Sequence, residues 1–244
     1  MEDLSSRWKG IYLSGAIFSL FVIFGIISDI TFGIITGGNL TALPMSAAGR
    51  FSQLQQNPLL GLYNLDLLNV VIQILSIPVM FAVYAALRRV SKASATLALV
   101  IFLTGSIIYI CGNNALAMFD LSEKYFAASN AQQKLLYEAA GEALLVKGVH
   151  GGSALFIGTF IPVLANLLFS ISMKNGKVFS KTTAVMGIIG NILLGLYVVL
   201  ITFLPDAGQF ALVLAMPGGI LVLVWIIMFT VNLFRIKFRL VKHD

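Results

Sequence analysis

Six long apolar stretches leave this chain few ways to fold. They cover residues 11–35, 62–87, 96–111, 144–173, 182–204 and 210–236, and a helix of about 20 residues can cross the hydrocarbon core of a bilayer. Within hydrocarbon every backbone N–H and C=O needs a partner inside the protein, which a helix supplies along its own length. A β-barrel would show shorter alternating segments. We therefore predict an all-α, polytopic transmembrane helix bundle of about six spans.

The composition supports a membrane protein over a soluble one. Charged residues make up 11% of the chain and hydrophobic residues 59%, whereas a soluble domain carries about 25% charged residues. The formal net charge of +6 would suggest nucleic acid in a soluble protein. Here the basic residues flank the apolar stretches, so we predict the lipid bilayer, and no nucleic acid, as the partner. We treat residues 1–244 as a single transmembrane domain.

The basic residues also predict the orientation of the bundle. Twelve of the sixteen lie in the four segments that would share one side of the membrane. They are Arg7, Lys9, Arg88, Arg89, Lys92, Lys174, Lys177, Lys181, Arg235, Lys237, Arg239 and Lys242. The positive-inside rule then places both termini in the cytoplasm. The first apolar stretch is too long for a cleaved signal peptide, so we expect it to stay as the first span of a multi-pass protein of a bacterial inner membrane.

The opposite, outer side has the two sizeable loops, residues 36–61 and 112–143. The first contains Pro44 and Pro58, which predict irregular structure. The second carries a helix-start signal, with Ser129 as N-cap and Gln132 at the third helical position. We expect a short amphipathic helix there, lying on the outer membrane surface or capping the bundle.

Polar residues gather in the outer half of the predicted bundle. Asp66, Asn69 and Gln73 open the second stretch at spacings of three and four, which places them on one helical face. Polar side chains inside a membrane are costly and suggest function. We interpret this face as the lining of an outward-facing cavity. The alternative is that these side chains join neighbouring helices by hydrogen bonds.

Three further residues extend this candidate ligand site. Asp29 lies late in the first span, where it can pair with Lys147 or His150 at the start of the fourth stretch. His150 could relay protons because the imidazole titrates near neutral pH. The alternative for each is an interfacial side chain bonded to water or to a neighbouring helix. Gly148 and Gly152 form a small-xxx-small pattern, which permits close helix packing.

The sequence predicts neither a metal site nor a cofactor. The chain has one cysteine and two histidines. His150 lies in an apolar stretch and His243 in the basic tail, so a zinc site of three or four such ligands is improbable. Phosphate-binding, metalloprotease and serine-hydrolase motifs are absent from the sequence.

Three short stretches carry a resemblance to a known family. They are residues 113–125 (NNALAMFDLSEKY), 139–144 (AAGEAL) and 179–184 (FSKTTA). In this order they resemble a bacterial family of multi-pass membrane proteins known only as a domain of unknown function, and the resemblance extends over most of the chain. It implies about six spans and a bacterial membrane. It supplies no catalytic or binding residues.

Three functions compete. The first is the binding or transport of a small molecule or lipid through the polar cavity. Its candidate residues are Asp29, Asp66, Asn69, Gln73, Lys147 and His150. The second is a non-catalytic accessory or sensor protein that acts through helix–helix contacts, with a partner or as a homo-oligomer. The third, ranked last, is an intramembrane enzyme with Asp66, Glu142 or His150 as acid or base.

Overall fold

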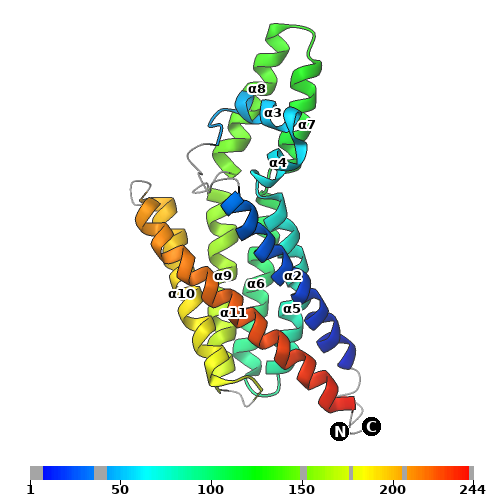
Figure 1. The fold of residues 1–244 in the computed structure, drawn as a ribbon, viewed down its shortest axis with the longest axis vertical. Coiled ribbons are helices and arrows are strands. Elements are labelled where there is room, and N and C mark those ends of the chain that lie inside the picture. The colour runs from blue at the N-terminus through cyan, green and yellow to red at the C-terminus, as the bar shows by residue number, and fades with distance from the viewer. Residues whose placement is uncertain (1–7, 36–42, 149–152, 176–177, 205–207, 242–244) are drawn as a thin grey trace.

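The computed structural model describes residues 8–35, 43–148, 153–175, 178–204 and 208–241, and their regular secondary structure is helical throughout (Figure 1). Six helices are long and apolar enough to cross a membrane, which confirms the predicted fold class. These helices are α2 (Lys9–Ile35), α5 (Leu67–Leu87), α6 (Lys92–Gly112), α9 (Ser153–Asn175), α10 (Lys181–Phe203) and α11 (Gly208–Val241). The remaining four are α3 (Ala47–Gln56), α4 (Pro58–Tyr63), α7 (Ala115–Ala127) and α8 (Ala131–Gly148).

The six long helices form a closed ring in chain order. Each packs against the next along the chain, and α11 returns to pack against α2. The start of α2 and the end of α11 lie together at one end of the bundle, which we name the inner end (Figure 1). The shorter helices gather at the opposite, outer end. That the inner end faces the cytoplasm stays a prediction from the basic residues.

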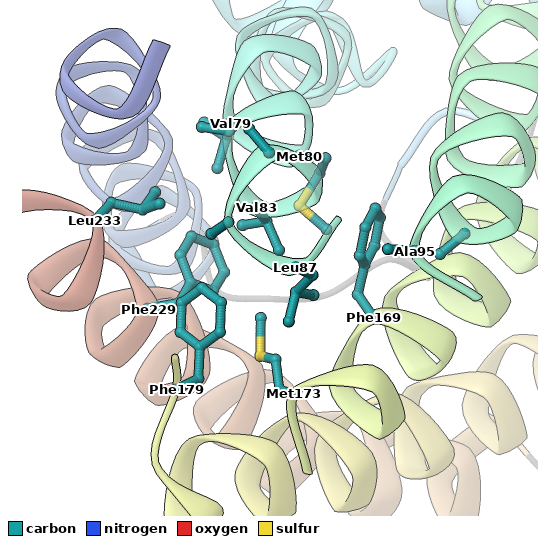
Figure 2. Close-up of a cluster of buried hydrophobic side chains, with 14 of the residues drawn as sticks. Val79, Met80, Val83, Leu87, Ala95, Phe169, Met173, Phe179, Phe229 and Leu233 are labelled. Atoms are coloured by element: carbon teal, nitrogen blue, oxygen red, sulfur yellow. The ribbon is translucent and has the colours of Figure 1, made fainter. Parts of the chain in front are cut away.

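The inner half of the ring is filled by apolar side chains from all six spans, many of them large (Figure 2). Phe169 and Met173 of α9 and Phe229 of α11 belong to this core, and all three are buried. Trp225 packs edge-on against Phe229, with ring centroids 4.9 Å apart, and its indole N–H points to the Met173 sulfur at 3.3 Å. The other labelled side chains of this inner core are Val79, Met80, Val83, Leu87, Ala95, Phe179 and Leu233.

Glycines let the helices of the ring approach closely. A Cβ added at Gly105 would collide with Pro162 of α9, and one added at Gly158 would lie 2.7 Å from the Tyr109 Cα. The α6 and α9 backbones are therefore nearly in contact, which is how helices gain van der Waals attraction where lipid removes the hydrophobic drive to associate.

From Ala47 onward the first outer loop is helical, which corrects the prediction of irregular structure for that part. Ser46 accepts a hydrogen bond from the Gly49 N–H at 3.2 Å and so caps α3. Asn57 accepts one from the Leu60 N–H at 3.1 Å, and Pro58 follows at the first position of α4. Proline is favoured there because the first helical N–H needs no partner within the helix. The residue that suggested a break begins a helix instead.

The second outer loop forms two helices, and they project beyond the bundle rather than lie across its end (Figure 1). The cap of α8 is one residue later than predicted, since the Gln133 N–H donates to Asn130 at 2.9 Å while Ser129 bonds to the Gln133 side chain. Together α3, α4, α7 and α8 make what we call the outer unit. Its own small core contains Phe51, Leu54 and Met118.

Two predicted spans are shorter than their apolar stretches. The second begins at Leu67, because Asn64, Leu65 and Asp66 separate α4 from α5. The fourth begins at Ser153, because residues up to Gly148 belong to α8. Residues 62–63 and 144–148 of these apolar stretches belong to α4 and α8 of the outer unit, which hydropathy alone does not distinguish from a span.

Candidate functional site

A cavity of about 420 Å³ lies in the outer half of the ring. Five of the six spans contribute to its lining, and none of the described side chains of α11 does. On α9 the lining extends from Phe156 to Asn166, ten residues that rise about 15 Å along a helix. The cavity is therefore elongated along the bundle.

The structure brings four of the six predicted site residues together. Asp29 of α2, and Asp66, Asn69 and Gln73 at the start of α5, all line the cavity. Lys147 does not line it, because it lies exposed in the last turn of α8. His150 and Gly152 lie outside the described residues.

Asp66 adopts an unusual backbone conformation at the break between α4 and α5. Its φ of 63° places it in the left-handed region, alone among the described non-glycine residues. Although it stands at the N-cap of α5, its side chain makes no capping bond. One carboxylate oxygen instead accepts from the Asn69 amide at 3.3 Å. A left-handed non-glycine residue costs roughly 1–2 kcal/mol, and such strain is commonest at functional sites.

A buried arginine of the outer unit acts on this carboxylate. Arg50 of α3 is only 7% exposed, and its Nε and one terminal nitrogen have no hydrogen-bond partner. Burial lowers the pKa of the Arg50 guanidinium, and the negative charge of Asp66 partly offsets that shift. The outer unit is thereby coupled electrostatically to the cavity.

Gln73 satisfies both interpretations of the polar face. It lines the cavity, and its amide nitrogen donates to Ser106 of α6 at 2.7 Å. The Ser106 hydroxyl in turn donates to the Phe102 carbonyl of its own helix at 2.7 Å. The amide thus joins α5 to α6 while one face of its side chain stays against the cavity.

Tyr63, the last residue of α4, bonds to α2 beside the cavity residue Asp29. Its hydroxyl donates to the Asp29 carbonyl oxygen at 3.1 Å, and its ring packs on Phe32 with centroids 5.5 Å apart. Burial, with the nearby charges of Asp29 and then Asp66, raises the pKa of Tyr63 to about 12. The phenol stays neutral at any physiological pH and serves as a donor.

Two asparagines fasten the outer unit to the bundle. The Asn113 amide donates to the Leu65 carbonyl at 2.8 Å, and the Asn114 amide donates to the Leu144 carbonyl at 2.9 Å. Gly148 packs against the Asn114 side chain, since a Cβ there would lie 2.9 Å from the Asn114 amide nitrogen. Gly148 therefore makes room for the Asn114 side chain. It ends α8 of the outer unit and does not belong to a transmembrane helix.

Sequence reasoning missed the polar contribution of α9. Pro162 has no N–H to give the Gly158 carbonyl, so that acceptor loses its helix bond, and both residues line the cavity. One turn deeper, the side-chain oxygen of Asn166 is buried and has no partner. Their shared signal is the three- and four-residue spacing of Thr159, Pro162 and Asn166, which places them on one face of the helix.

Tyrosines and threonines of α6 and α10 were also missed. Tyr109, Tyr197 and Thr202 all line the cavity. Tyrosine and threonine are ordinary in transmembrane helices, so no sequence signal separated these three from the rest. Only the ring geometry selects them.

Of the acid–base candidates considered for an enzyme that the structure describes, Asp66 and Glu142, only Asp66 lines the cavity. Glu142 lies in the outer unit, where one carboxylate oxygen accepts from the Ala47 N–H at 2.7 Å at the start of α3, and it does not line the cavity. Among the described residues, no three or more His, Cys, Asp or Glu side chains are grouped to hold a metal ion.

A family model described as domain of unknown function (DUF4386) matches residues 12–231 of the chain. The match takes in all six spans and the outer unit. Neither the curated proteins nor the solved structures include a significant match.

Proposed function

Since this chain is a multi-pass membrane protein that belongs to the family described as domain of unknown function (DUF4386), we propose that it binds a small amphiphilic molecule in the outer cavity. Binding of this kind would serve either transport across the membrane or its sensing. The observation that carries the proposal is the cavity itself, assembled from five spans.

The size and lining of the cavity support a ligand. Its volume of about 420 Å³ falls in the range typical of small-molecule sites, roughly 300–1,000 Å³. Polar side chains such as Asn69 and Gln73 share the wall with apolar ones such as Ile72 and Val163. A molecule with one polar and one apolar part would satisfy both.

The position of the cavity supports access from the bilayer. At the outer end α11 packs on α10, where a Cβ at Gly218 would lie 3.0 Å from the Leu193 Cβ. Toward the inner end α11 crosses to α2 (Figure 1). The outer parts of α2 and α11 both carry exposed apolar side chains, including Phe24 and Met216. An amphiphile could therefore reach the cavity sideways, between these two helices.

Cysteine protection tests the proposal. In a Cys111→Ser background, Thr159→Cys places one thiol in the cavity wall, since Cys111 is the one cysteine of the chain and is exposed. A small maleimide should label this thiol, and dodecanol in nanodiscs should slow the labelling in proportion to its concentration. The matched control is Thr104→Cys, an exposed threonine of α6 outside the cavity, which dodecanol should not protect.

Two results would overturn the proposal. If Thr159→Cys does not label at all, the cavity is closed to small molecules. If it labels but neither dodecanol nor an amphiphile with a charged head protects it more than Thr104→Cys, the cavity holds no amphiphile. Either result would favour the accessory or sensor hypothesis, in which the polar side chains serve helix packing.

A further inference from the structure

We infer that the inner end of the bundle binds the phosphate of an anionic phospholipid, and that Arg88 and Trp8 form the site. The inference is independent of the proposed function, because the cavity lies in the outer half of the ring. It comes from the sign of the charges at the inner end, from the geometry of the Arg88 guanidinium and from an apolar surface beside it.

The described charges of the inner end are positive. Basic side chains lie there around the ring, namely Arg88, Arg89, Lys92, Lys174, Lys181 and Arg235. The Asp and Glu residues that the structure describes all belong to the outer half or the outer unit, namely Asp29, Asp66, Asp120, Glu123, Glu138 and Glu142.

The sequence gives the same sign for this whole side. Its twelve basic residues stand against three acidic residues near the two termini, Glu2, Asp3 and Asp244, which lie outside the described residues. The net charge of the inner side is therefore positive. Anionic headgroups are the partners that a bilayer supplies to such a surface.

Arg88, the C-cap residue of α5, is held in one place by an aromatic ring. Its guanidinium carbon lies over the Trp8 ring, 3.4 Å from the centroid, and the Trp8 ring stacks on Phe81 with centroids 6.2 Å apart. The Arg88 Nε is enclosed and has no hydrogen-bond partner. Stacking on a ring fixes a planar group that would otherwise lose entropy on binding.

A phosphate fits the part of Arg88 that stays open. Only Nε of this guanidinium is enclosed, and no hydrogen bond within the described part of the chain occupies the two terminal nitrogens. Two terminal N–H groups of an arginine can donate in parallel to two phosphate oxygens. Arg89, the next residue, is exposed, so it adds charge to the surface without this fixed geometry.

The surroundings of Arg88 suit a lipid better than a soluble anion. Trp8 directly precedes α2 and Arg88 directly follows α5, so both lie where spans end, and tryptophan is enriched at that level of a bilayer. Phe81, which stacks on Trp8, is 38% exposed and lies further into the span. A phospholipid with its phosphate on Arg88 would cover this apolar surface with an acyl chain.

Lipid titration followed by native mass spectrometry in a non-ionic detergent tests the inference. Palmitoyl-oleoyl phosphatidylglycerol and phosphatidylcholine share their acyl chains and a phosphate, and they differ in net charge. We expect the first phosphatidylglycerol to bind at a concentration roughly tenfold lower than the first phosphatidylcholine, because hydrogen bonds between charged groups are strong and choline is repelled by the basic surface.

Matched variants locate the site. Arg88→Gln should remove most of the preference for phosphatidylglycerol, and Arg88→Lys should restore only part of it because lysine lacks the planar fork. Trp8→Leu should weaken the preference by removing the ring under the guanidinium. The control is Arg89→Gln, which loses the same charge at the neighbouring exposed residue and should keep most of the preference. Thermal unfolding in phosphatidylcholine checks that each variant is folded, and Arg88→Lys and Trp8→Leu suffice if Arg88→Gln is not.

Four results would overturn the inference. Equal binding of the two lipids would remove the charge preference. Equal losses in Arg88→Gln and Arg89→Gln would replace the site with a diffuse basic surface. A full preference in Trp8→Leu would show that the ring does not form part of the site. Displacement of phosphatidylglycerol by excess inorganic phosphate would assign the site to a soluble anion.

Discussion

In the inner half of the ring, Phe169, Met173 and Phe229 fill the space between the helices, while in the outer half the same helices enclose a cavity lined by Asp66, Asn69 and other polar groups. Most serine and threonine hydroxyls near the inner core donate to carbonyls of their own helices, as in the bond from Ser170 to the Asn166 carbonyl, whereas Tyr12 donates to the Ala85 carbonyl of α5 at 3.2 Å. Several polar groups of the outer half bond between helices or lack a partner. One bundle thus contains a structural half and a half suited to a ligand.

The difference shows how a membrane bundle can remain stable although part of it contains costly polar groups. The inner core supplies the packing contacts that hold six helices in register, so the outer half can tolerate strain at Asp66 and an orphan acceptor at Asn166. The two halves should therefore respond differently to substitution, with stability depending on the first and ligand occupancy on the second.

The largest expected effect comes from the same substitution made in both halves. Phe169→Ala should lower the free energy of unfolding by roughly 3–5 kcal/mol, because Phe169 is fully buried and lipid cannot fill the void. Phe156→Ala should cost less than about 1 kcal/mol, since Phe156 is only partly buried and lines the cavity. Thermal unfolding in detergent measures both. Equal losses would show that the outer half is also a packed core.

The seam between α6 and α9 gives the next largest effect. Gly158→Ala should destabilise the protein by roughly 1–3 kcal/mol, because its Cβ would meet the Tyr109 backbone, which cannot rotate away. Gly219→Ala is the matched control, since a Cβ there meets nothing within 4 Å, and alanine favours a helix over glycine by up to about 1 kcal/mol. A neutral Gly158→Ala variant would show that α6 and α9 lie farther apart.

The outer unit should respond separately from the spans. Glu142→Ala removes the acceptor of the Ala47 N–H and should cost about 1 kcal/mol, felt mainly as faster hydrogen exchange in α3. Glu138→Ala, on the same helix one turn earlier, should leave α3 unchanged. Faster exchange throughout the spans would contradict a separate outer unit.

The smallest expected effect is a loss of stability at alkaline pH that comes from Tyr63. The folded protein holds the Tyr63 proton up to a pKa of about 12, above the ordinary value of 10.0. The stability from this residue is therefore complete below about pH 10 and is lost as the pH rises toward 12. The Tm difference between the wild type and Tyr63→Phe should shrink over that window, while other tyrosines cancel in the comparison. A Tm difference that stays constant over this pH range would show that the pKa of Tyr63 is not raised and that its hydroxyl is exposed to water.

Much of the candidate site could be predicted from spacing along single helices. Asp66, Asn69 and Gln73 share a face because a helix repeats every three to four residues, and the structure places all three in one wall. Lys147 lies outside the described lining because residues up to Gly148 form α8 of the outer unit, which the apolar pattern does not distinguish from the start of a span. Tyr109 and Tyr197 could not be found, since nothing in the sequence of α6 or α10 specifies which helix each residue faces.

The sequence by itself determined the number of spans and their helical form, because length and apolarity suffice where hydrocarbon forbids unpaired backbone groups. The tertiary structure alone decided the closed order of the ring, the folding of both outer loops into one unit and the placement of a cavity in one half. These depend on contacts between residues far apart in the chain, such as Gln73 with Ser106 and Asn114 with Leu144. Hydropathy has no information about such pairs, since it describes each segment against lipid and not against its neighbours.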